Sequence, residues 1–216
     1  MLYNLNKKGT IIITIGRSGS HLLGDIISNK LTKNNIEHKS FKEMFLYPPT
    51  VHTIDTFYKT AKNKLINSPC YTIVQVQDFN SKLWLLTYEN DWISDYHVII
   101  LKRTDNIAHF FSKQILENFH ATVPVHTFKG INSGSFASLQ NKSLTVDIDS
   151  VWQFYGEKQI LNRFIGDETV IYEDMIQWDD VEQSMYLKNN YTVAFQDLFT
   201  NYNKIVEILT PSIRSN

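Results

Sequence analysis

The sequence of 216 residues predicts an α/β fold of three layers (α/β/α), in which helices cover both faces of a central parallel sheet. Short runs rich in β-branched residues alternate with helical patterns along most of the chain, as in folds built from strand-helix-strand units. Most of these runs are apolar at nearly every position, which is typical of strands covered on both faces. Right-handed crossovers between such strands place the helices over the sheet.

The strands are predicted from their β-branched and apolar residues. All but the second are nearly continuous apolar runs, and the five segments are residues 10–15, 37–41, 71–76, 97–102 and 168–173. Helical periodicity in the remaining chain predicts helices at 20–33, 53–66, 80–91, 104–119 and 149–165. A last amphipathic stretch, residues 198–209, predicts a helix that docks on the sheet.

Two segments interrupt this alternation. Residues 44–52 contain Pro48 and Pro49 and predict irregular structure, and residues 120–146 are rich in Gly, Ser, Thr and Asn without a sustained period. A loop as long as the second is more often a binding loop or lid, or partly disordered, than a plain connector. We expect one domain over residues 1–216.

Composition limits the classes of partner. The net charge of −1 argues against a general nucleic-acid binder, which carries a basic excess. Cys70 is the sole cysteine, so it excludes an internal disulfide and suits a reducing compartment. No segment has the roughly 18 apolar residues of a membrane helix, and no signal peptide is recognisable. We therefore expect a cytoplasmic protein without a membrane span, and a homo-oligomer remains possible.

The turn after the first predicted strand, in "IIITIGRSGSHLL", has the composition of an anion site. Gly16 and Gly19 allow the backbone to curl, so that N–H groups at the start of the next helix converge on one ligand. Arg17 adds a full charge, and Ser18 and Ser20 add hydroxyl donors. The alternative is an ordinary glycine turn in which Ser20 caps the helix and Arg17 is solvated.

This turn differs from the nucleoside-triphosphate loop, which requires a lysine after its second glycine. "IGRSGSHLL" instead resembles the 5′-phosphosulfate loop of the sulfotransferases that use PAPS (3′-phosphoadenosine 5′-phosphosulfate), above all the bacterial carbohydrate (trehalose-type) enzymes, whose loop reads R-S-G-S-T-L-L. His21 departs from that pattern, which has a small hydroxyl residue there. The resemblance implies a P-loop nucleotide-kinase-like fold and donor binding by Arg17, Ser18, Gly19, Ser20, His21 and Leu22.

A second motif resembles the 3′-phosphate site of the same family. In "VIILKRTDNIAHFFSKQI", Arg103 follows an apolar strand and Ser112 lies nine residues further on, as in the family's motif. Guanidinium groups are forked, permanently charged donors that suit phosphate. Either residue alone favours a plain surface position, whereas the two together, at the family spacing and after a buried strand, favour the phosphate site. Asp105 is expected to cap the following helix. Two of the four arginines of the chain fall at the two predicted anion sites.

The family resemblance also implies a catalytic base. "FKEMF" (41–45) is similar to an acidic segment after the second strand of the bacterial enzymes, and it places Glu43 at the matching position. Its apolar neighbours would raise the basicity of a buried carboxylate. His52 is the alternative base, and a solvated Glu43 is the alternative without a role. Arg17 is expected to stabilise developing charge, and no metal is expected.

A third stretch, "ETVIYEDMI" (168–176), resembles a late strand of the family, in which Tyr172 is expected to pack and Glu173 to begin a helix. Taken together, the resemblance implies a sulfotransferase that moves a sulfuryl group from PAPS to a hydroxyl of a carbohydrate, glycolipid or small metabolite and releases PAP. Acceptor choice is expected in residues 44–60 and 120–146. The alternatives are a non-catalytic PAP- or nucleotide-binding protein and a P-loop phosphotransferase.

Overall fold

The computed structural model describes residues 2–41, 54–76, 91–119, 143–178 and 195–210. The chain divides into two compact units, each of which is described by itself. The sheet unit consists of residues 1–103 and 157–184, and the helical unit of residues 104–156 and 185–216. The expectation of a single domain over residues 1–216 stays a prediction.

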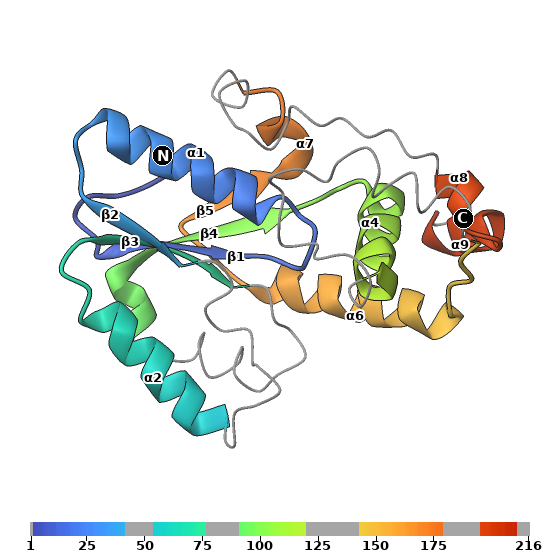
Figure 1. The fold of residues 1–216 in the computed structure, drawn as a ribbon, viewed down its shortest axis with the longest axis horizontal. Coiled ribbons are helices and arrows are strands. Elements are labelled where there is room, and N and C mark those ends of the chain that lie inside the picture. Colours follow the sequence, from blue (N-terminus) through green and yellow to red (C-terminus); the bar gives the residue numbers. More distant parts are fainter. Residues whose placement is uncertain (1, 42–53, 77–90, 120–142, 179–194, 211–216) are drawn as a thin grey trace, which may run out of the picture. The chain divides into compact units, whose positions relative to one another are not determined.

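The sheet unit is built on five parallel strands, which confirms the predicted α/β class (Figure 1). In sheet order these strands are β2 (His38–Phe41), β3 (Tyr71–Val76), β1 (Gly9–Ile13), β4 (Tyr96–Lys102) and β5 (Glu168–Ile171). Every residue of β1 and β3 is buried, as their continuous apolar runs predict, whereas β2 at the edge is partly exposed.

Helices cover both faces of this sheet. Figure 1 shows α1 (Ser20–Lys33) over one face and α2 (Ile54–Ile66) over the other. The short elements of the unit are η1 (Asp91–Asp95) and α7 (Tyr172–Met175). Within the ranges that the structure describes, no helix has the length and apolarity needed to cross a membrane.

The helical unit contains α4 (Asn106–Phe119), α8 (Phe195–Leu198), α9 (Tyr202–Leu209) and the first part of α6 (Ile148–Arg163). Its core is aromatic: the ring centroid of Phe111 lies 4.7 Å from that of Phe199 and 4.9 Å from that of Tyr202. The prediction of one helix over 198–209 is wrong. The helix is broken because Leu144 pairs with the chain between α8 and α9, accepting from the N–H of Thr200 at 2.8 Å.

The order of the strands marks one position at the end of the sheet. From β1 the chain crosses to β2 at one edge of the sheet. From β3 and from β4 it crosses toward the opposite edge. In open α/β sheets, ligands bind beyond the carboxyl ends of the strands where this direction reverses. The carboxyl end of β1 is such a place, and the residues that follow it are 14–19.

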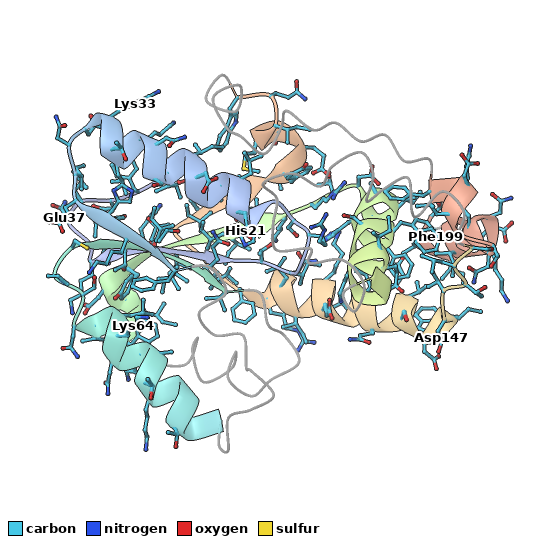
Figure 2. The ribbon with its side chains drawn as sticks, viewed as in Figure 1. His21, Lys33, Glu37, Lys64, Asp147 and Phe199 are labelled. Carbon is cyan, nitrogen blue, oxygen red and sulfur yellow. The ribbon has the colours of Figure 1, made fainter. Side chains whose placement is uncertain are left out.

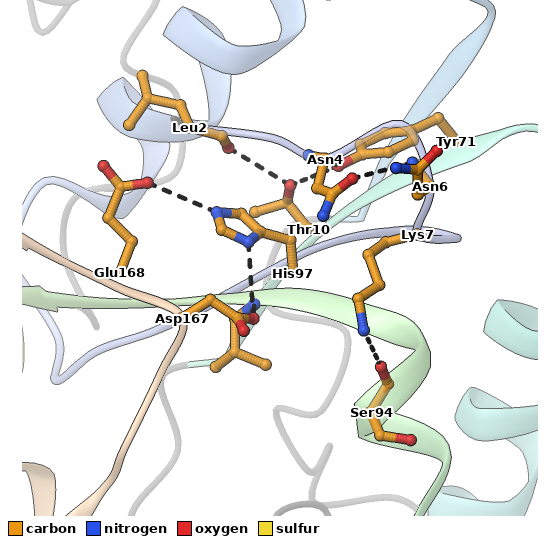
Figure 3. Close-up of polar contacts among 11 residues, drawn as sticks. Leu2, Asn4, Asn6, Lys7, Thr10, Tyr71, Ser94, His97, Asp167 and Glu168 are labelled. Carbon is orange, nitrogen blue, oxygen red and sulfur yellow. Dashed lines mark hydrogen bonds and ion pairs between the residues drawn. The ribbon is translucent and has the colours of Figure 1, made fainter.

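The opposite, amino end of the sheet is fastened by polar contacts (Figure 3). The hydroxyls of Thr10 and Tyr71 lie 2.8 Å apart, and the N–H of Asn4 donates to Tyr71 at 3.3 Å. His97 of β4 lies between two carboxylates, with each ring nitrogen 3.5 Å from a carboxylate oxygen, of Asp167 and Glu168 respectively. These contacts join the amino end of β1 to that of β3, and the amino end of β4 to that of β5.

Candidate anion-binding site

The turn between β1 and α1 is tied to its neighbours on both sides. The hydroxyl of Thr14 donates to the carbonyl of Leu101 in β4 at 2.8 Å, and its N–H donates to the carbonyl of Val76 in β3 at 3.1 Å. Ser18 is completely buried, and its hydroxyl donates to the carbonyl of Ile15 at 2.9 Å. That hydroxyl therefore holds the turn in shape.

The backbone of the turn adopts the left-handed conformation twice. Gly19 has φ 85°, which is natural for glycine, but Arg17 has φ 67°, which costs an L-residue about 1–2 kcal/mol. Strained backbone of this kind concentrates at functional sites. Turns in which the chain reverses its hand also present N–H groups to a common point and bind anions in many proteins.

Helix α1 begins at Ser20, after a glycine. Gly19 occupies the N-cap position, and no side-chain hydrogen bond caps the helix there. The alternative in which Ser20 caps α1 is therefore wrong: Ser20 is already the first helical residue. The N–H groups of a first helical turn have no partner within the helix, and the helix dipole makes this end positive.

Tyr172 connects the turn to the end of β5. A methyl group on Gly19 would come within 2.5 Å of ring atom Cδ2 of Tyr172 and 2.6 Å of Cε2. Glycine is thus required at this position for its left-handed backbone and for the close approach of the ring. The expectation that Tyr172 packs is confirmed, and its partner is the turn between β1 and α1.

Arg103 follows β4 directly, and its guanidinium reaches back to the turn. Its Nη1 donates to the main-chain carbonyl of Arg17 at 3.3 Å, and its Cζ lies 4.8 Å from the centroid of the Tyr172 ring. The side chain is only 16% exposed. Three segments predicted separately from the sequence therefore meet: the turn after β1, the end of β4 and the start of α7.

Positive charge is concentrated in this cluster. Burial lowers the pKa of Arg17, and the neighbouring charge of Arg103 lowers it further, against a smaller raising effect from Tyr172. The ammonium of Lys158 donates to the carbonyl of Arg103 at 2.7 Å. Glu173 provides a carboxylate 3.7 Å from Nε of Arg103, too far for a hydrogen bond. An anion placed here would relieve the repulsion between the two guanidiniums.

Other predicted donor-binding residues lie at the start of α1. Ser20 and Leu22 are buried, with 5% and 6% exposure. His21 is partly exposed at the end of α1 that follows the turn (Figure 2). Its imidazole occupies the position of the small hydroxyl residue in the resembling loop.

The remaining predicted residues are placed differently. Ser112 lies on α4 in the helical unit, so its pairing with Arg103 stays a prediction. Asp105 caps α4 as expected, because its carboxylate accepts from the N–H of Ala108 at 2.8 Å. Glu43 and His52, the candidate bases, lie outside the described residues.

Gln75 lies inside the sheet unit. It is fully buried in β3, and its Nε2 packs against Gly24 of α1, where an added methyl group would lie 2.6 Å away. Neither polar atom of its amide has a hydrogen-bond partner among the described residues. Gln75 therefore lies in the core between β3 and α1.

Sequence reasoning missed two charged partners of Arg103. Lys158 is one of 17 lysines and stands in an ordinary helical pattern, so nothing in the sequence distinguishes it. Glu173 was expected only to begin a helix, although its place directly after Tyr172 in the "YEDM" stretch was a usable signal.

Comparison with known proteins identifies no family for this chain. No protein-family model matches the chain, and no curated protein sequence matches it significantly. The function is therefore inferred from the residues of the site.

Proposed function

We propose that the protein is a PAPS-dependent sulfotransferase with a nucleotide-kinase-like arrangement of its sheet. It moves the sulfuryl group of PAPS to a hydroxyl of a carbohydrate, glycolipid or small metabolite and releases PAP. The observation that carries the proposal is the contact between Arg17 and Arg103 at the carboxyl ends of β1 and β4. Both arginines belong to motifs that resemble the two phosphate-binding motifs of that family.

The residues present suit a ligand with more than one anionic group. Main-chain and ring contacts hold the Arg103 guanidinium at the turn, where its charge lowers the pKa of Arg17. The end of α1 adds main-chain donors that suit phosphate or sulfate oxygens. PAPS carries a phosphosulfate and a separate 3′-phosphate, which is the kind of charge that two guanidiniums bind.

PAPS supplies a sulfuryl group on a leaving group that is already a stabilised phosphate. Within this chain, Arg17 and the N–H groups of the turn would stabilise negative charge that develops on the transferred and departing oxygens. The acceptor hydroxyl must lose its proton as its oxygen bonds to sulfur and the bond from sulfur to the phosphate oxygen breaks. Glu43 is the proposed base for that proton, with His52 as the alternative.

The test is a calorimetric titration with PAP, with ADP as the control that lacks the 3′-phosphate. We expect micromolar or tighter binding of PAP, much weaker binding of ADP, and no effect of magnesium. Equal binding of the two nucleotides, or a magnesium requirement, would overturn the sulfotransferase proposal in favour of a phosphotransferase.

A second candidate is a PAP-binding protein without catalysis, which His21 favours because it replaces the hydroxyl of the resembling loop. Glu43→Gln separates the two. An enzyme would lose turnover by about 100-fold or more while donor affinity stays within a factor of two. A protein that binds without catalysis would show no turnover in either form.

A further inference from the structure

Glu173 occupies an unusual position relative to the arginine pair. Its carboxylate oxygen Oε1 lies 3.7 Å from Nε of Arg103, which is within ion-pair distance but beyond a hydrogen bond. The Nε atom is buried and makes no hydrogen bond to any described residue. Arg103 thus combines a nearby negative charge with a donor that is not used.

The remaining contacts of Arg103 hold the guanidinium in place. Nη1 is committed to the carbonyl of Arg17, and Tyr172 covers one face of the group at 4.8 Å. A buried N–H donor without an acceptor is unfavourable, because it has lost its hydrogen bonds to water. The donor can be satisfied either by a small approach of Glu173 or by an oxygen of an incoming anion.

We propose that Glu173 is the counter-ion of Arg103 in the ligand-free protein and that a bound phosphate or sulfate group displaces it. The inference rests on the proposed function, because it names a side chain that competes with the ligand at the same anion site. Glu173 then has two opposite effects. It stabilises the folded protein without ligand by offsetting the charge of Arg103, and it weakens anion binding because the ligand must compete with it.

Its exposure suits this role. The Glu173 side chain is 31% exposed, so the carboxylate can turn toward water when an anion arrives, whereas the Arg103 side chain is 16% exposed and stays. The next residue, Asp174, carries the same charge on the same helix, but its side chain is exposed. Asp174 therefore provides a matched control for the general electric field of α7.

The experiment compares wild type, Glu173→Gln and Asp174→Asn by calorimetric titration with PAP and with inorganic pyrophosphate at fixed ionic strength. Loss of a partly exposed ion pair predicts about two- to fivefold tighter binding of both ligands by Glu173→Gln. For each ligand, the fold-change in affinity caused by Asp174→Asn is expected to be less than half of that caused by Glu173→Gln. Unchanged or weaker binding by Glu173→Gln, or an equal effect of Asp174→Asn, would overturn the proposal.

Two further measurements keep the result decisive. The midpoint of urea unfolding without ligand should fall in Glu173→Gln, whereas a merely structural glutamate would lower stability and affinity together. Should Glu173→Gln fail to fold, Glu173→Asp keeps the charge but withdraws it from Nε. We then expect tightening of less than twofold for Glu173→Asp, and weaker binding would contradict the counter-ion role.

The outcomes separate this inference from the proposed function. Selective binding of PAP over ADP without tightening in Glu173→Gln would leave the sulfotransferase proposal standing and remove the counter-ion. Equal binding of PAP and ADP, with pyrophosphate bound more tightly by Glu173→Gln, would do the reverse. Absence of binding of PAP and of pyrophosphate by all three proteins would overturn both.

Discussion

Nη1 of Arg103 donates a hydrogen bond of 3.3 Å to the main-chain carbonyl of Arg17. This bond joins the turn after β1 to the end of β4 and places the guanidinium of Arg103 close enough to act on the charge of Arg17. Burial and the charge of Arg103 both lower the pKa of Arg17, so the folded protein disfavours the charged form of this side chain. Such an arrangement costs folding free energy, and a bound anion near the arginines would offset that cost.

Arg103→Ala should weaken PAP binding by about 10- to 100-fold, because a charge-assisted hydrogen bond to a buried guanidinium is worth about 1.5–3 kcal/mol. Arg163→Ala is the matched control, since Arg163 is an exposed arginine in the last turn of α6. Calorimetric titration measures both. An equal effect of the two variants would show that only the overall charge of the protein matters.

Arg17→Gly should make the protein more stable and unable to bind PAP tightly. Glycine removes the strain of φ 67° and the buried charge, which together predict a gain of about 1 kcal/mol in the free energy of unfolding. Asn35→Gly is the control, because Asn35 also has a positive φ, 56°, but follows α1 at its other end. Urea unfolding measures the stability of the two variants, and titration measures their binding of PAP. Lower stability of Arg17→Gly would contradict the conclusion that the backbone of Arg17 is strained.

Gly19→Ala should destabilise the protein by at least about 2 kcal/mol, because the new methyl group meets the ring of Tyr172 and the backbone has φ 85°. Gly16→Ala lies in the same turn but would meet no atom within 4 Å, so it should be tolerated. The measurement is the free energy of unfolding in urea. Similar values for the two variants would mean that Tyr172 does not pack on the turn.

Stability should fall as the pH rises above about 10. Burial raises the pKa of Tyr71 and of Tyr96 above the ordinary 10.0 of a phenol, and the hydrogen bonds of Tyr71 with Thr10 and Asn4 only partly oppose this. The unfolded chain then loses these protons at lower pH than the folded protein, so the folded state is fully favoured below pH 10 and loses stability above it. Urea unfolding at a series of pH values measures the slope, which Tyr71→Phe should reduce. A slope unchanged by Tyr71→Phe would exclude Tyr71 as a contributor.

Much of the fold could be predicted because it follows from local sequence. Helix α1 has the predicted bounds, 20–33, since a glycine with a left-handed backbone precedes it and the apolar positions of the helix repeat regularly. The strands lie where the β-branched runs predict them, with shifts of one or two residues at their ends. The last helix was predicted wrongly because its break depends on Leu144, a residue 55 positions away from Phe199 in the sequence.

The candidate site could be predicted only in its parts. Arg17 and Arg103 each stand out beside a strand end, but their contact joins residues 86 positions apart and depends on β1 and β4 being neighbours. The ring of Tyr172 under Gly19 depends likewise on the position of β5. Sequence patterns give the end of each strand and do not give the order in which the strands pair. The roles of Glu43 and Ser112 stay predictions.

Lys158 holds the carbonyl of Arg103 at the point where the chain leaves the sheet unit, and Lys158 itself lies just after the chain returns. The segment from Thr104 to Gly156 is therefore an insertion whose two ends are pinned together. Insertions with adjacent ends can be lengthened, shortened or exchanged at little entropic cost to the host domain. Because the core of the helical unit also takes Phe199 and Tyr202 from the C-terminal part of the chain, this insertion can be exchanged only together with residues 185–216.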